Sequence, residues 1–195
     1  MEIDSALCVA GAVCALGFSA AGSAIGIGKA ACAAIGAWKK CYAQNKPAPY
    51  ILFSYVGAPL TQTLYGMVLM FSILGLLSPE AGTVALPGFG VAAVILGVFA
   101  GLGIGASAAM QGQAAAGAAD SQAETGKGLA NNMTALGVVE TVAIFVMVFA
   151  LIAIGSLTKD AGAADALPAE EPAVIETVPD AGDPVPVVED VAVED

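Results

Sequence analysis

Histidine is absent from these 195 residues, and tryptophan occurs once. The lack of histidine excludes histidine-based catalysis and histidine metal sites. Four cysteines, at positions 8, 14, 32 and 41, show no metal-binding spacing. Charge is scarce as well, because 12% of the residues are charged, against about 25% in soluble domains. These absences argue against an ordinary soluble enzyme.

Long uncharged runs occupy most of the chain. No charged residue occurs between Lys46 and Glu80 or between Glu80 and Asp120, and between Asp4 and Lys39 the only charge is Lys29. A helix that spans a membrane needs roughly 20 mostly apolar residues. Four segments are that long, at about 5–37, 50–77, 90–118 and 131–157. The sequence therefore predicts an all-α membrane protein with four transmembrane helices.

The net charge of −11 belongs almost wholly to the C-terminal region. Residues 158–195 contain eleven acidic groups and one lysine, which leaves the membrane part close to neutral. Half of the ten prolines also lie there, and no aromatic residue does. Such a segment buries too little apolar surface to fold by itself, so we expect a disordered acidic tail.

The charged connections predict an orientation in the cell membrane. The connection at about 38–49 carries Lys39, Lys40 and Lys46, whereas the next connection carries only Glu80. Lysine-rich connections favour the cytoplasm, so we place the loops at 38–49 and 119–130 there and both termini outside. The N-terminus lacks the basic region of a secretory signal, and we expect the first helix of this multi-pass protein to be retained.

The chain repeats itself. The Gly-Ile-Gly of residues 26–28 recurs at 103–105, and Gln62-Thr63 recurs as Glu140-Thr141, at offsets of 77 and 78 residues. The repeat predicts two related helical hairpins, at 1–80 and 81–157, a known way of building membrane transporters. Since Gln62 stands where the second copy has Glu140, only the second copy carries a carboxylate at this position.

The two helices of each predicted hairpin differ in composition. The first and third helices are crowded with Gly, Ala and Ser, and the second and fourth carry Leu, Met, Phe, Ile and Val. Small residues let helix backbones approach closely. One explanation is a homo-oligomeric ring with the first and third helices near its axis. The alternative is close packing of small residues within one chain.

Glu140 is a lone carboxylate deep in an apolar helix. It lies nine residues beyond Asn131, or about 14 Å into the bilayer, near the midplane. An ionised carboxylate there costs roughly 3 kcal/mol or more. Lys29 is predicted nearer the cytoplasmic end, so no basic side chain of the chain matches Glu140 in depth. The neutralising partner should therefore be a bound cation from outside the chain.

Neutral oxygens are predicted at the same depth. Thr61, Gln62 and Tyr65 share one helix face, Gln111 lies on the third helix, and Pro59 loosens the turn that contains the carbonyl of Ala58. Hard cations prefer oxygen ligands. One carboxylate with several neutral oxygens suits a monovalent cation, because the site then closes near zero net charge. A proton carrier, which needs only Glu140, and a channel-like oligomer whose pore Glu140 lines remain alternatives.

Four stretches resemble one known family: "GSAIGIGKA", "PLTQTLYG", "AMQGQAAAG" and "VVETVAI". The chain resembles, over about 5–157, the proteolipid rotor subunit (K or c) of V-type and A-type rotary ATPases. The resemblance to sodium-transporting members implies that Thr61, Gln62, Gln111, Glu140 and the Ala58 carbonyl bind Na⁺. It also implies that Tyr65 hydrogen-bonds the carboxylate. The family often has Leu at the position of Ala58 and Gly at that of Leu60.

The same resemblance implies a set of partners. These are identical subunits in a ring, surrounding lipid, a stator membrane subunit with a basic side chain, and a central-stalk subunit at the cytoplasmic loops. Na⁺, or H⁺ in the alternative, is the only cofactor expected, with no organic cofactor and no nucleic acid. ATP hydrolysis or synthesis is expected on other subunits, with no catalytic site on this chain.

Overall fold

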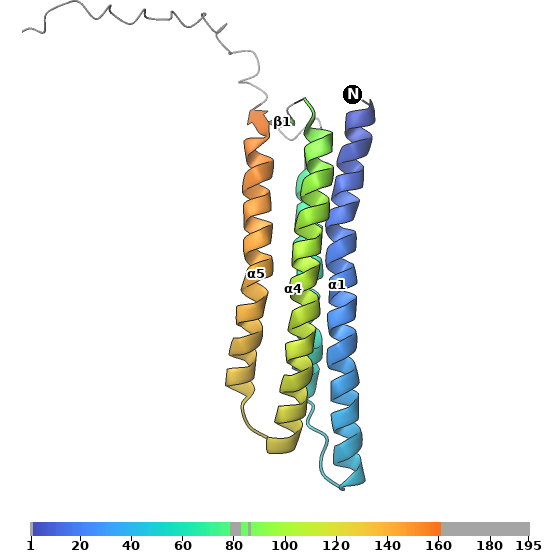
Figure 1. Cartoon of the computed structure of the whole chain (residues 1–195), viewed down its shortest axis with the longest axis vertical. Helices are drawn as coiled ribbons and strands as arrows, with labels where there is room; N and C mark the ends of the chain where they lie inside the picture. Colours follow the sequence, from blue (N-terminus) through green and yellow to red (C-terminus); the bar gives the residue numbers. More distant parts are fainter. Residues whose placement is uncertain (1, 79–82, 86, 161–195) are drawn as a thin grey trace, which may run out of the picture. The chain divides into compact units, whose positions relative to one another are not determined.

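Four long helices form the described part of the chain (Figure 1). The computed structural model describes residues 2–78, 83–85 and 87–160. The helices are α1 (Glu2–Ala43), the segment α2–η1–α3 (Leu52–Gly57, Ala58–Leu60 and Thr61–Gly75), α4 (Phe89–Thr125) and α5 (Leu129–Ser156). All four are long and apolar enough to cross a membrane. The prediction of four helices able to span a membrane is confirmed by their length and composition, which indicate a multi-pass membrane protein.

The helices run further than predicted. Residues 38–43 and 119–125 are helical, so the connections expected at 38–49 and 119–130 are shorter than the sequence indicated. Charged residues marked the predicted ends, but Lys, Glu and Ala all favour the helix, and a helix need not end at the membrane surface. The α4–α5 turn consists of 126–128, where Gly126 and Gly128 have positive φ values of 66° and 94°.

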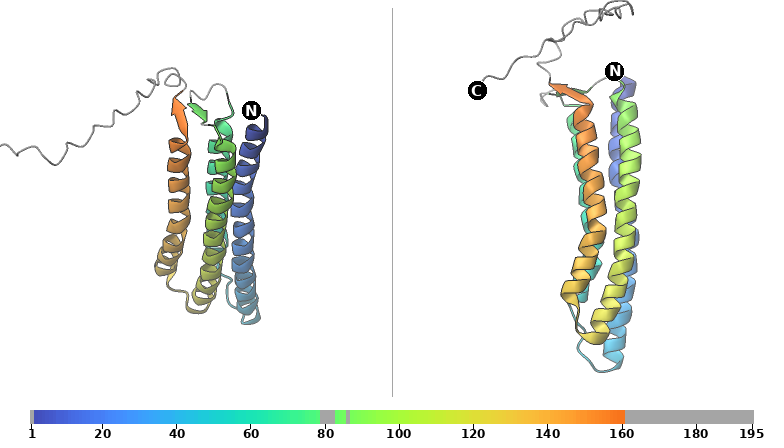
Figure 2. Two further views of the ribbon diagram at one scale, coloured as in Figure 1. Left: turned by 45° about the horizontal axis from the view of Figure 1, so that its top comes forward. Right: turned by 60° about the vertical axis from the view of Figure 1, so that its left-hand side comes forward.

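Two layers of helices pack against each other (Figure 2). One layer holds α1 and α4, and the other holds α3 and α5. The small-residue helices therefore lie together, as do the bulky ones. At Gly22 an added Cβ would meet the backbone of Gly105, and at Gly112 it would meet the backbone of Gly26. Small residues thus allow α1 and α4 to pack with their backbones in contact.

Two side-chain contacts tie α1 to α4 near their ends. The Gly90 amide at the start of α4 donates to Asp4 Oδ1 of α1 over 2.9 Å. This bond satisfies one of the free N–H groups with which every helix begins. At the opposite end Lys40 of α1 and Glu124 of α4 form an exposed ion pair. Helices far apart in sequence are therefore held in register at both ends.

A short β-ribbon lies outside the helices. Strand β1 (Thr83–Ala85) pairs antiparallel with β2 (Thr158–Asp160), with Val84 opposite Lys159. The predicted tail begins at 158, whereas in the structure residues 158–160 form β2, because their backbone pairs with the α3–α4 connection. Residues 161–195, the remainder of the predicted disordered tail, lie outside the described residues.

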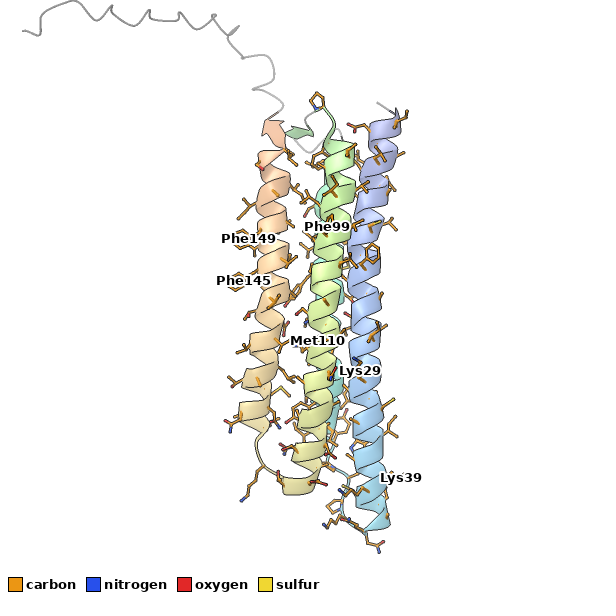
Figure 3. All side chains as sticks on the ribbon, viewed as in Figure 1. Lys29, Lys39, Phe99, Met110, Phe145 and Phe149 are labelled. Atoms are coloured by element: carbon orange, nitrogen blue, oxygen red, sulfur yellow. The ribbon has the colours of Figure 1, made fainter. Side chains whose placement is uncertain are left out.

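Two apolar clusters divide the bundle along its length. One is centred on Leu69, Ile73 and Phe89, and the other on Leu52, Tyr55 and Leu136. Many large apolar side chains point outward instead, including Phe99, Phe145 and Phe149, which are 61–70% exposed (Figure 3). Such an exterior suits a hydrocarbon solvent. Between the two clusters the sequence places most of its deep polar side chains.

Candidate ion-binding site

Both carboxylate oxygens of Glu140 accept hydrogen bonds. The Tyr65 hydroxyl of α3 donates to Oε1 over 2.7 Å, and Gln111 Nε2 of α4 donates to Oε2 over 3.2 Å. Glu140 itself is half-buried on α5. Three different helices therefore meet at this side chain, because α5 packs against both α3 and α4.

Gln111 makes three side-chain hydrogen bonds, more than any other residue of the network. Its side chain is 1% exposed. Besides donating to Glu140, Nε2 donates to the Leu136 carbonyl over 3.1 Å. Its Oε1 accepts a hydrogen bond from Gln62 Nε2 over 2.8 Å. A buried amide needs such partners, because an unpaired buried polar group costs about 1–3 kcal/mol.

The network continues onto the kinked helix of the first hairpin. Gln62 is fully buried, and its Oε1 accepts from Thr61 Oγ1 over 3.3 Å. The Thr61 hydroxyl lies equally close to the carbonyl oxygen of Ala58, at 3.3 Å. Ala58–Leu60 form a turn of 3₁₀ helix, as expected where Pro59 cannot donate a backbone hydrogen bond. The loosened turn thus brings a backbone carbonyl into the polar network.

All six residues singled out from the sequence lie in one connected network. It runs from the Ala58 carbonyl through Thr61, Gln62 and Gln111 to Glu140, and ends at Tyr65. The residues come from three helices and span 83 positions in the sequence from Ala58 to Glu140, counted inclusively. The residues that the sequence predicts at one depth are therefore joined by hydrogen bonds.

Glu140 is the one charged residue of this network. Among the described residues no group of three or more His, Cys, Asp or Glu side chains is found, and the one ion pair joins Lys40 to Glu124. Lys29 Nζ lies 3.4 Å from Gln113 Oε1 on an exposed face, two residues along α4 from Gln111, and among the described residues it forms no ion pair with Glu140. The candidate site thus combines one carboxylate with neutral amide, hydroxyl and carbonyl oxygens, a donor set that suits a hard monovalent cation.

Three further groups support the site and were not predicted. The Leu136 carbonyl holds Gln111, and the Ser107 hydroxyl donates to the Val139 carbonyl over 2.9 Å, which fastens α4 to α5 one residue before Glu140. Ser107 lies one helical turn from Gln111, a spacing that marks a shared face. The four-residue spacing could have identified Ser107 from the sequence. The sequence near Gln111 does not indicate that its side chain donates to the Leu136 carbonyl of another helix.

A second polar cluster lies toward the α4–α5 turn. Asn132 Nδ2 donates to the Tyr55 hydroxyl over 3.1 Å, and this hydroxyl lies 3.4 Å from Gln122 Oε1. Tyr55 is fully buried. The cluster links α2, α4 and α5 two turns from Glu140 along α5, so it holds together the helices that carry the candidate site.

The chain was compared with known proteins by sequence. No protein-family model matches it, and no curated protein matches it.

Proposed function

We propose that this chain is a rotor subunit of a V-type or A-type rotary ATPase that carries Na⁺ across the cell membrane on Glu140. The observation that carries the proposal is the connected network of oxygens around one carboxylate between four apolar helices. An intramembrane ionisable residue is a functional site by default. The resemblance of four sequence stretches to rotor proteolipids supplies the class of machine.

The choice of Na⁺ follows from the donor set. A cation bound beside Glu140 has up to six oxygens within one network: two from the carboxylate and one each from Ala58, Thr61, Gln62 and Gln111. A monovalent ion neutralises the single carboxylate, whereas a divalent ion leaves a positive charge in hydrocarbon. Tyr65 keeps its hydroxyl on the carboxylate and so orients Glu140 toward the ion.

The transport cycle depends on the free-energy penalty for an ionised carboxylate in hydrocarbon. Na⁺ enters from an aqueous half-channel of a stator subunit and neutralises Glu140, so that the site can turn through lipid. An empty, charged site is blocked by the penalty for ionised groups in hydrocarbon. After nearly a full turn the stator's basic side chain favours release of Na⁺. A central stalk at the cytoplasmic loops couples this turning to ATP hydrolysis or synthesis on soluble subunits.

The internal repeat indicates how copies of the chain meet. Gly105 of α4 packs on Gly22 of α1, whereas its repeat counterpart Gly28 has no atom near the position of an added Cβ. The repeat counterpart of Gly22 is Phe99, which is 70% exposed. If the second hairpin of another copy packs on α1 in the same way, its Phe99 covers Gly28. Repetition of this contact closes a ring with α1 and α4 on the inside.

This packing predicts a disulfide between copies. In a variant without the four native cysteines, Gly28→Cys together with Phe99→Cys should crosslink neighbouring chains on mild oxidation. A ladder of dimers and larger species on a denaturing gel is expected. The control pair, Gly28→Cys with Phe149→Cys, uses an equally exposed phenylalanine of the bulky layer and should stay monomeric. Crosslinking in the control pair but not in the first would contradict the proposed ring.

Protection of Glu140 by Na⁺ tests the proposal directly. A hydrophobic carbodiimide reacts with the protonated carboxyl group, and bound Na⁺ displaces the proton. At fixed pH, added Na⁺ should therefore slow the labelling of Glu140 in the intact complex, as followed by mass spectrometry of the chain. The control is an equal concentration of choline chloride, which matches ionic strength. Equal labelling in both salts would refute Na⁺ binding.

A proton-carrying rotor is the second candidate. Both oxygens of Glu140 already accept hydrogen bonds from protein groups, and a protonated carboxyl group needs no further oxygen ligands. Labelling that responds to pH but not to Na⁺ would favour this version. A channel-like oligomer is separated from both rotors by the mass of the detergent-extracted complex, because only a rotor copurifies with nucleotide-binding subunits.

A further inference from the structure

Ser23 carries a buried hydroxyl without a partner. The residue is 2% exposed on α1, and among the described residues its Oγ is the one buried side-chain polar atom that makes no hydrogen bond. Ser19, one turn earlier, is equally buried and donates to its own helix at the Ala15 carbonyl over 2.7 Å. A buried polar group left unpaired costs free energy and calls for an explanation.

Two contacts place Ser23 opposite the ion site. Gly66 of α3 packs against Ser19, and Gly26 of α1 packs against Pro59. The two helices run in opposite directions (Figure 1). Ser23 lies between Ser19 and Gly26, as Gln62 lies between Gly66 and Pro59, with the same spacing on each helix. The register of the antiparallel pair therefore sets Ser23 at the level of Gln62.

Gln62 has an unused hydrogen-bond donor. Its amide nitrogen carries two N–H groups, and one of them donates to Gln111 Oε1. Its amide oxygen accepts from Thr61. The second N–H has no partner among the described residues, although the side chain is fully buried. An acceptor without a donor on α1 thus lies level with a donor without an acceptor on α3.

We propose that the Ser23 hydroxyl accepts this second N–H of Gln62 when Na⁺ is bound, and so holds the amide oxygen of Gln62 toward the ion. Ser23 is then a positioning residue on α1, the long helix that contributes no Na⁺ ligand. The inference rests on the proposed function. It assigns to Ser23 a role in choosing Na⁺ over H⁺, because a proton needs only Glu140, whereas Na⁺ also needs the Gln62 oxygen.

The experiment compares Ser23→Ala with Ser19→Ala in the intact complex. Each variant removes one buried hydroxyl from neighbouring turns of α1 without adding volume. Carbodiimide labelling of Glu140 is measured against Na⁺ at fixed pH, and against pH without Na⁺. For Ser23→Ala we expect the Na⁺ concentration that halves the labelling rate to rise about three- to tenfold, which corresponds to the loss of one neutral hydrogen bond. The midpoint of the pH titration of labelling should not change.

Each outcome decides the proposal. Ser19→Ala should match the unaltered chain in both titrations, because its hydroxyl bonds only to its own helix. An unchanged Na⁺ titration in Ser23→Ala overturns the role of Ser23. The same is true of an equal weakening in both variants, or of a shift in the pH midpoint, since each indicates a general packing effect. Na⁺-independent labelling of the unaltered chain would instead refute the proposed function itself.

Discussion

Replacing Glu140 with Gln should abolish Na⁺ transport and leave assembly intact. The amide has nearly the shape of the carboxylate but carries no negative charge. Na⁺ in the altered site would leave a net positive charge in hydrocarbon, at a cost of roughly 3 kcal/mol or more. Since each 1.4 kcal/mol is a tenfold change in affinity, the affinity for Na⁺ should fall at least about a hundredfold. The measurement is ²²Na⁺ uptake into vesicles that contain the complete complex.

Two controls test whether loss of transport is due to the charge of Glu140 itself: the mass of the assembled complex and a second carboxylate variant. The mass of the detergent-extracted complex should be unchanged in Glu140→Gln, because an amide still accepts a hydrogen bond from Tyr65. Glu124→Gln removes a different carboxylate, an exposed one paired with Lys40. Exposed ion pairs contribute little to stability, so this control should transport normally. Unaltered uptake by Glu140→Gln would remove Glu140 from the mechanism.

The second large effect is expected from Gly22→Ala. The new Cβ would meet the backbone of Gly105, and a backbone cannot move aside as a flexible side chain can. The two helices must therefore separate, which loosens the contacts that small residues provide along α1 and α4. Overpacking of this kind costs about 1–3 kcal/mol. We expect the midpoint of thermal unfolding in mild detergent, followed by circular dichroism, to fall by several degrees.

Gly137→Ala is the matched control for this effect. Gly137 lies within α5, and nothing lies near the position of its added Cβ. Within a helix, Ala is favoured over Gly by about 1 kcal/mol, so this variant should be neutral or more stable. Equal unfolding midpoints for the two variants would show that close approach at Gly22 does not limit stability.

The residues of the candidate site could be picked out from the sequence because position along a helix depends on local geometry. A helix rises about 1.5 Å per residue, so the distance of Glu140 or Gln62 from a helix end follows from the sequence. The helix ends themselves were less predictable. Asp120 and Glu124 indicated a loop, yet both are helical, since charge marks the membrane surface and not the end of a helix.

By itself the sequence determined the four apolar helices, the helix break at Pro59, the small-residue composition of α1 and α4, and the place of the lone carboxylate within an apolar helix. These depend on residues near one another in the chain. Only the tertiary structure decided that Gln111 bridges Gln62 to Glu140, that Gly22 meets Gly105, that residues 158–160 pair with 83–85, and that Ser23 is left without a partner. Those outcomes depend on the rotation and spacing of helices distant in sequence, which the packing of all their side chains sets together.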